Sequence, residues 1–205
     1  MRLPPQLAQL PLTFTMSSIN AHEALGACKD LEFQTVLDVG SGDGAHAAYF
    51  MSLGKDVTTC DMKEEADYVG RYTSIKMPQQ YDLIWCSHVL EHQQNVSTFL
   101  KKIAIDLKKG GYFVVTVPPL KHDIVGGHVS LWNAGLLLYN LILAGFDCSK
   151  AKIKEYGYNI SVIVRYNPIK LPKLKMDYGD IETLAEYFPF PVRNGFDGRI
   201  QEFNW

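Results

Sequence analysis

Residues 36–44, with the sequence VLDVGSGDG, constrain the fold of this chain more than any other segment. An apolar run carries Asp38 near its end, and Gly40, Gly42 and Gly44 follow at alternate positions before a segment of helical character. Glycine has no Cβ and adopts positive φ angles without strain, so such a turn lets the backbone approach a ligand closely. The turn also directs the free N–H groups of the following helix towards that ligand. The sequence therefore predicts a strand, a ligand-binding turn and a helix, and we expect the ligand to be a nucleoside-bearing cofactor.

Apolar runs and helical patterns alternate along the rest of the chain. The run 81–86 is typical of a buried strand, and apolar residues at helical spacing over 95–109 predict a helix that ends in lysines. This alternation indicates an α/β fold with a doubly wound, mostly parallel sheet covered on both faces. A hairpin at 150–166 predicts an antiparallel last strand in a seven-stranded sheet. The expected strands are 34–39, 56–60, 68–72, 81–86, 112–117, 150–156 and 160–166, and the expected helices are 17–31, 43–53, 95–109 and 130–144.

The composition is that of an ordinary single-domain globular protein. The 205 residues are 47% hydrophobic and 20% charged, which is enough apolar material for a full core without a metal or a disulfide. A net charge of −2 argues against a dedicated nucleic-acid-binding protein. No segment has the length of a membrane span, the N-terminus lacks the apolar run of a signal peptide, and widely spaced cysteines favour a reduced, cytoplasmic protein. We expect a helical lead-in at 1–33, the main domain at 34–166 and a C-terminal extension at 167–205.

Two kinds of cofactor compete for the glycine turn. Residues 40–45 satisfy the G-x-G-x-x-(G/A) pattern of dinucleotide-binding proteins, so an NAD-type oxidoreductase is one hypothesis. Asp38 lies two residues before the first glycine, where it would repel a pyrophosphate. Its charge instead suits a cofactor with an ammonium and a sulfonium group, which is S-adenosylmethionine. Asp61, at the end of the next strand, suits the ribose hydroxyls of either cofactor.

Five blocks of sequence resemble, in order, the class I S-adenosylmethionine-dependent methyltransferases, and in particular the small-molecule branch with a Leu-Glu-His signature after strand four. The blocks are VLDVGSGDG, CDM, YDLIWCSHVLEH, LKKGGYFVVTVP and GHVSLWNAGLLLYNLILAGF, and the resemblance covers roughly residues 34–166. The resemblance implies a Rossmann-like fold with S-adenosyl-L-methionine as cofactor. One feature departs from the family: the acidic residue often found near the adenine amino group has no counterpart in 69–72.

The resemblance also implies which residues bind the cofactor. Asp38 would face its amino-acid end, Asp61 would accept hydrogen bonds from the ribose hydroxyls, and Met62 would pack against adenine. Cys86 and Ser87 would lie beside the methionine portion. The turn residues that would line the cofactor are Gly40, Ser41, Gly42 and Gly44.

Three histidines are candidates for the proton transfer that a hydroxyl acceptor requires. His128 follows two glycines in a loop expected to overhang the transferable methyl group, and His88 and His92 follow strand four. Structural roles are the alternative: His128 could cap the next helix, and Glu91 and His92 could fix the loop. The spacing H-x-x-E-H is also that of an inverted zinc motif, but the family resemblance explains this segment without a metal. The predicted catalytic residues are therefore His128, His92 and His88, and no metal is predicted.

The predicted function is methyl transfer to a small molecule, in the first place to a hydroxyl of a saccharide or another metabolite. The motif for N-methylation of nucleobase amines, Asn/Asp-Pro-Pro-aromatic, is missing after strand four. The basic stretch 150–175 suits an acidic acceptor, and the aromatic residues of 176–205 predict a lid or a contact in a homo-oligomer. The alternatives are an NAD-type oxidoreductase and a non-catalytic binding module with the same fold.

Overall fold

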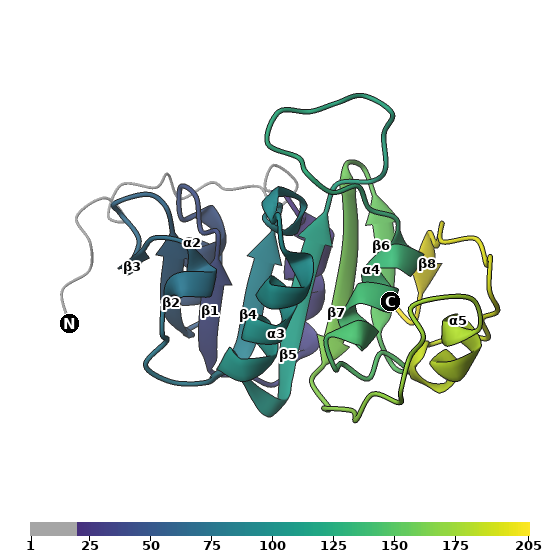
Figure 1. The fold of residues 1–205 in the computed structure, drawn as a ribbon. Helices are drawn as coiled ribbons and strands as arrows, with labels where there is room; N and C mark the ends of the chain where they lie inside the picture. The colour runs from purple at the N-terminus through teal and green to yellow at the C-terminus, as the bar shows by residue number, and fades with distance from the viewer. Residues whose placement is uncertain (1–19) are drawn as a thin grey trace.

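A single mixed sheet forms the centre of the computed structural model, which describes residues 20–205 (Figure 1). Its eight strands lie in the order β3-β2-β1-β4-β5-β7-β6-β8. The first five are parallel, whereas β7 runs antiparallel to both of its neighbours, and β8 runs antiparallel to β6. The strands are β1 (Thr35–Val39), β2 (Asp56–Asp61), β3 (Tyr68–Val69), β4 (Tyr81–Ser87), β5 (Leu107–Val117), β6 (Lys152–Tyr156), β7 (Asn159–Arg165) and β8 (Glu202–Phe203).

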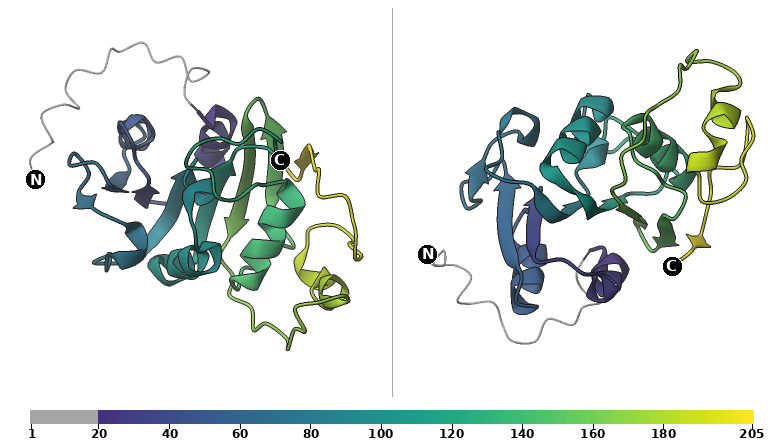
Figure 2. Two further views of the ribbon diagram at one scale, coloured as in Figure 1. Left: turned by 45° about the horizontal axis from the view of Figure 1, so that its top comes forward. Right: turned by 90° about the horizontal axis from the view of Figure 1, so that it is seen from below.

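Helices cover both faces of this sheet (Figure 2). Successive strand residues point to opposite faces, so Val36 and Leu37 enter different cores. Leu37 packs in the cluster that holds the buried side chains of α3 and α4, and Val36 packs in the cluster that holds those of α1 and α2. The helices are α1 (His22–Ala27), α2 (Ala45–Ser52), α3 (Val96–Asp106), α4 (Ala134–Leu143) and α5 (Asp180–Thr183).

The predicted fold class is confirmed, and the predicted number of strands is wrong by one. The additional strand, β8, is only two residues long and pairs with β6 at the edge of the sheet. Two residues carry no periodic pattern, so the sequence gives no signal for such a strand.

Two predicted helix boundaries are also wrong. The helix expected over 95–109 ends at Asp106, because the chain pairs with β4 from Leu107 onward and the Lys108 ammonium lies 2.8 Å from an Asp82 carboxylate oxygen. The helix expected from residue 130 begins at Ala134, because the Asn133 side chain accepts a hydrogen bond from the N–H of Leu136 and caps the helix. Ser17 and Ser18, the expected caps of the first helix, lie outside the described residues.

Residues 167–205 share the main core and do not form a separate body. Leu184 and Phe188 are buried in the same cluster as the apolar side of α4. The N–H of Gly135 donates to the carbonyl of Gly198 at 2.9 Å, so that the backbone of the tail contacts the first turn of α4. The predicted roles of this segment as a lid or a subunit contact stay predictions.

None of the helices within residues 20–205 has the length and apolar character needed to cross a membrane.

Candidate functional site

The glycine turn and the ends of β1, β2 and β4 meet at the carboxyl edge of the sheet, where ligands bind in doubly wound folds. Gly40, Gly42 and Gly44 have φ angles of 77°, 58° and 80°, as the sequence predicts for such a turn. The Gly40 N–H donates to the carbonyl of Cys60 at 2.8 Å. A Cβ at Gly40 would lie 2.1 Å from Cγ2 of Val89, so only glycine fits where the turn meets the chain leaving β4.

Asp38 is the most unusual side chain at this edge. It is fully buried, and apart from a weak contact with the backbone N–H of Ala47 that falls short of hydrogen-bond geometry, neither carboxylate oxygen has a donor within residues 20–205. Burial in the first place, and the charge of Asp61 in the second, raise the pKa of Asp38 to about 7. The backbone of Ala47 opposes this shift only in part. A buried carboxylate without a donor is unfavourable unless a cation accompanies it. The residue therefore fits a cationic ligand and does not fit a pyrophosphate.

Asp61 connects the end of β2 to the glycine turn. One of its carboxylate oxygens accepts a hydrogen bond from the N–H of Gly42 at 2.9 Å, and the other accepts from the N–H of Lys63 at 3.0 Å. An ionised carboxylate offers about four lone-pair positions, so two remain for the predicted ribose hydroxyls. Met62, the predicted contact of adenine, follows directly and leaves 65% of its surface exposed.

Cys86 and Ser87 end β4 beside the turn, and both are buried. Burial raises the pKa of the Cys86 thiol well above its usual value, so this group is no nucleophile. The Ser87 hydroxyl has no hydrogen-bond partner within the described part of the chain, which makes it a second unpaired polar group at this edge. Ser41, also predicted to line the cofactor, is buried in the turn itself.

His88 is fixed by contacts of both ring nitrogens. Its Nε2 lies 3.0 Å from Oδ1 of Asn159, and its Nδ1 lies 3.3 Å from the Glu91 carboxylate. Its ring stacks on Tyr158 with centroids 6.0 Å apart. Burial alone would lower the pKa of His88, but the contacts with Glu91 and Asn159 outweigh burial and raise it. These contacts hold the His88 side chain in one position in the segment that follows β4.

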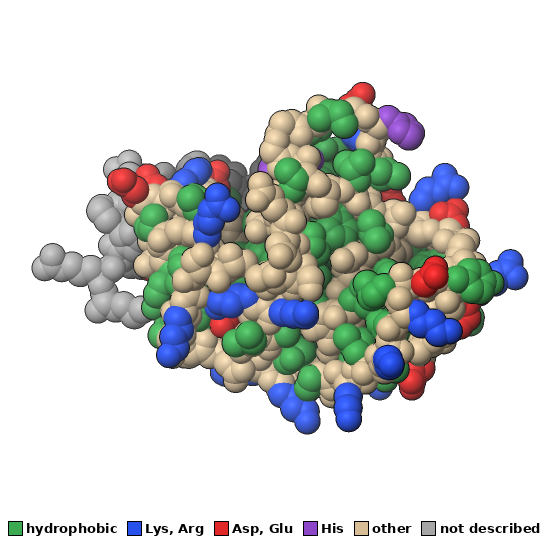
Figure 3. Space-filling view, viewed as in Figure 1, with side chains coloured by type: hydrophobic (Ala, Val, Ile, Leu, Met, Phe, Trp, Pro, Cys, Tyr) green, Lys and Arg blue, Asp and Glu red, His purple; other side chains and the backbone are tan. Residues whose placement is uncertain are grey.

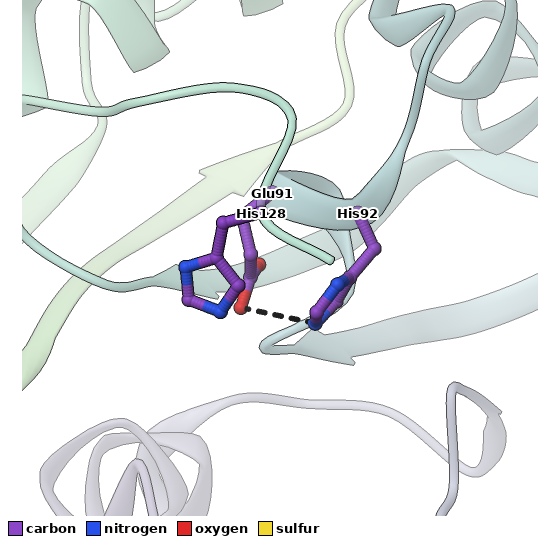
Figure 4. A group of neighbouring side chains, drawn as sticks. All are labelled: Glu91, His92 and His128. Carbon is purple, nitrogen blue, oxygen red and sulfur yellow. Dashed lines mark ion pairs between the residues drawn. The ribbon is translucent and has the colours of Figure 1, made fainter. Parts of the chain in front are cut away.

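The chain after β4 forms a 3-10 turn, Leu90–His92, and the H-x-x-E-H segment is not an α-helix. The side chain of His92 donates from Nδ1 to the carbonyl of Gly127 at 2.8 Å. The ring of His128 lies edge-on to that of His92, with centroids 4.9 Å apart (Figure 4). The sequence places His92 and His128 in different loops, and the structure brings them together next to Glu91.

A pocket of about 200 Å³ opens beneath the loop 118–131, between β5 and α4. This loop projects beyond the sheet at the top of Figure 1 and carries exposed hydrophobic side chains. Figure 3 shows hydrophobic side chains at the same end of the molecule. His128 lines the pocket, and its predicted place over the transferable methyl group stays a prediction. Sequence reasoning missed Tyr158 and Trp132, although the hairpin turn at 157–158 could have indicated the first, because β7 begins at the same edge at which β5 ends. The lining residues are Pro118, Pro119, Lys121, Asp123, Ile124, Val125, His128, Val129, Ser130, Leu131, Trp132 and Tyr158.

The strand order, the glycine turn and the buried acidic residue before it define a class I S-adenosylmethionine-dependent methyltransferase. A methyltransferase-domain family model matches residues 18–154, and the chain belongs to this family. S-adenosylmethionine is the cofactor of the family, as predicted. This family assignment rules out the alternative hypothesis that the chain is an NAD-type oxidoreductase.

Curated relatives of the chain include two bacterial ubiquinone biosynthesis O-methyltransferases. The protein from Shewanella pealeana is 30% identical, and the match covers 65% of this chain and 68% of that protein. The protein from Proteus mirabilis is also 30% identical, with coverage of 38% of this chain and 39% of that protein. The matched region thus amounts to between about two fifths and two thirds of these relatives.

Solved structures share the fold at low sequence identity. A Burkholderia thailandensis 1,6-didemethyltoxoflavin-N1-methyltransferase, with 1,6-didemethyltoxoflavin and S-adenosylhomocysteine bound, superposes with a TM-score of 0.63 at 18% identity, covering 75% of this chain and 81% of that one. Human N-acetylserotonin methyltransferase in complex with S-adenosylmethionine gives 0.54 at 19% identity, covering 74% of this chain and 50% of that one.

Proposed function

We propose that this protein transfers the methyl group of S-adenosylmethionine to a hydroxyl group of a small molecule that binds beneath the loop 118–131. The observation that carries the proposal is the pocket with His128 in its wall, at the same sheet edge as the glycine turn and Asp38. The names of the curated relatives support an oxygen acceptor.

The residues of the turn would hold the cofactor. The carboxylate of Asp38 would offset its positive charge, and Asp61 would keep the turn in shape while accepting from the ribose. When bound, the cofactor supplies a methyl group on a sulfonium, which is an intrinsically good leaving group. The chain has little covalent chemistry to perform and mainly aligns the acceptor and excludes water. The loop 118–131 would exclude water from the acceptor.

The lining of the pocket favours an acceptor with a flat, apolar body over the saccharide that the sequence suggested. Ile124, Val125 and Trp132 supply apolar surface, and Tyr158 supplies an aromatic ring. Of the basic residues of 150–175, none lines the pocket as described; its single lysine is Lys121. We therefore expect a phenol-like hydroxyl to be a better methyl acceptor than a sugar hydroxyl. Release of S-adenosylhomocysteine with a panel of phenols, catechols and nucleotide sugars tests this order.

We expect His128→Ala to lower turnover of a hydroxyl acceptor about 100-fold or more, the usual effect of removing a group that assists proton transfer. The affinity for S-adenosylmethionine should stay the same, because His128 lines the acceptor pocket and not the glycine turn. Steady-state kinetics and calorimetric titration measure the two effects. His122→Ala is the matched control, since His122 lies exposed on the same loop and outside the pocket lining. Full turnover by His128→Ala would remove this residue from the mechanism.

A further inference from the structure

Glu91, His92 and His128 form a cluster that the methyl-transfer site alone does not explain (Figure 4). Each offers one ligand atom, a carboxylate oxygen or an imidazole nitrogen, and these atoms lie within 4.8 Å of one another. One carboxylate and two imidazoles are a donor set suited to divalent transition metals. The cluster extends from buried Glu91 through half-buried His128 to exposed His92, so an ion could enter from solvent.

The ring of His92 is held as metal-binding histidines usually are. Its Nδ1 donates to the carbonyl of Gly127 at 2.8 Å, so that in the neutral ring the lone pair is on Nε2. That Nε2 faces Glu91, 3.8 Å from Oε1 (Figure 4). In the neutral ring this nitrogen and the carboxylate oxygen are both available as ligands to the same cation.

The carboxylate of Glu91 provides the second, independent observation. The residue is fully buried, and its Oε1 already has an imidazole beside it, with His88 Nδ1 3.3 Å away. Its two ionic contacts, with His88 and His92, both involve Oε1, so Oε2 is left without a partner among the described residues. Burial of such a group is unfavourable unless a cation or a donor accompanies it.

Backbone hydrogen bonds hold together the two segments that carry the cluster. The carbonyl of Glu91 accepts hydrogen bonds from the N–H groups of Val129 at 2.8 Å and Ser130 at 3.2 Å. These bonds join the loop that carries His128 to the 3-10 turn that carries Glu91 and His92. A third bond, from the N–H of His128 to the carbonyl of Val125 at 3.1 Å, closes the loop around the histidine.

We propose that Glu91, His92 and His128 bind one divalent transition-metal cation, such as Zn²⁺, at the wall of the acceptor pocket. Three protein ligands leave open coordination positions. On the basis of the proposed function, an acceptor hydroxyl would take one of them, and the ion would lower the pKa of that hydroxyl so that its proton passes to solvent. The resulting oxygen anion would form the new bond to the methyl carbon as the bond from that carbon to the sulfonium breaks, leaving neutral S-adenosylhomocysteine. His128 would then act as a ligand and not as a base. This proposal departs from the sequence prediction of no metal, because the H-x-x-E-H pattern pairs His92 with His88, whereas the structure pairs it with His128.

The test is a metal titration of the full chain. The protein is first treated with a chelator to remove bound metal and is then titrated with Zn²⁺ in competition with a chromophoric chelator. The absorption spectrum of bound Co²⁺ reports the coordination geometry of the site. We expect one Zn²⁺ per chain. His92→Ala and His128→Ala should each weaken binding at least about 100-fold, beyond the 10- to 100-fold range of outer-shell effects. His122→Ala, in the same loop, should bind as the unchanged chain does. Because Glu91→Gln changes a buried group, the two histidine variants carry the test.

Less than one equivalent of bound Zn²⁺, or equal binding by the His92→Ala and His128→Ala variants, would overturn the metal site. A parallel titration with S-adenosylmethionine separates this outcome from failure of the proposed function. A protein that binds Zn²⁺ but fails to bind S-adenosylmethionine would contradict the methyl-transfer function and leave the metal site intact. A protein that binds no Zn²⁺, yet binds S-adenosylmethionine and turns it over, would contradict the metal site and leave the methyl-transfer function intact.

Discussion

Asp38→Asn is expected to weaken the binding of S-adenosylmethionine about 30-fold, which corresponds to about 2 kcal/mol for a lost interaction with a charged group. The carboxylate is buried beside the glycine turn and has no hydrogen-bond donor within the described chain, so a cationic ligand is the partner it lacks. Asparagine keeps the shape of the side chain and removes the charge. Calorimetric titration at pH 7 measures the loss. Asp56→Asn is the control, because Asp56 is exposed at the amino end of β2, far from the carboxyl ends of the strands where the glycine turn lies.

The same residue predicts how cofactor binding depends on pH. The pKa of Asp38 is raised to about 7 by burial and by Asp61, and the bound cation requires the ionised form. Affinity should therefore fall as the pH is lowered, by about 20-fold between pH 7 and pH 5 for a single linked proton, approaching the loss expected for Asp38→Asn. The Asp38→Asn variant should show a flat profile over this range. An equally steep profile in the variant would assign the proton to another group.

Without cofactor, Asp38 should lower the stability of the protein above neutral pH. Its pKa is higher in the folded than in the unfolded state, so its stabilising contribution is fully present below about pH 4 and is lost as the pH rises through about 7. The loss is on the order of 4 kcal/mol. Asp38→Asn should therefore unfold at higher denaturant concentration than the unchanged chain at pH 8. A less stable variant at pH 8 would contradict the raised pKa.

Gly40→Ala is expected to destabilise the protein by about 3 kcal/mol, from backbone strain at positive φ together with overpacking. The φ angle is 77°, and the added Cβ would lie 2.1 Å from Cγ2 of Val89. For a domain of this size the midpoint of thermal unfolding should fall by roughly 10 °C. Circular dichroism during a thermal scan measures the shift, and binding of S-adenosylmethionine should weaken because the turn is displaced.

Gly42→Ala is the matched control for strain without a clash. Its φ angle is 58°, and no atom lies within 4 Å of an added Cβ, so it should cost only about 1 kcal/mol. The double variant Gly40→Ala/Val89→Ala removes the methyl group that clashes and should recover at least about 1 kcal/mol relative to the two single effects. Equal destabilisation by Gly40→Ala and Gly42→Ala, with no recovery in the double variant, would show that the contact with Val89 is unimportant.

The elements that the sequence predicts well are those specified by local chemistry. The glycine turn has positive φ angles at three positions and follows an apolar strand. Consecutive residues of the sequence specify both features, since the glycines directly follow the apolar run. The same holds for the strand over Tyr81–Ser87, whose residues are almost all apolar and buried. Such features depend on neighbours in sequence, so the sequence alone is enough to predict them.

The elements that the sequence does not predict depend on long-range pairing. Lys108 follows a strong helical pattern, yet it joins β5, because pairing with β4 and the contact with Asp82 override the local preference. In the same way, His128 reaches Glu91 only through the hydrogen bonds from Val129 and Ser130 to the Glu91 carbonyl. Neither contact leaves a periodic signal in the chain.

Titration of the unmodified protein with S-adenosylmethionine and, separately, with NAD tests most directly whether the buried carboxylate and the open backbone turn select a cationic methyl donor. We expect saturable binding of S-adenosylmethionine with one molecule per chain, weakened in Asp38→Asn, and no binding of NAD. Binding of NAD in its place, or binding of S-adenosylmethionine that Asp38→Asn leaves unchanged, would contradict the role given to Asp38.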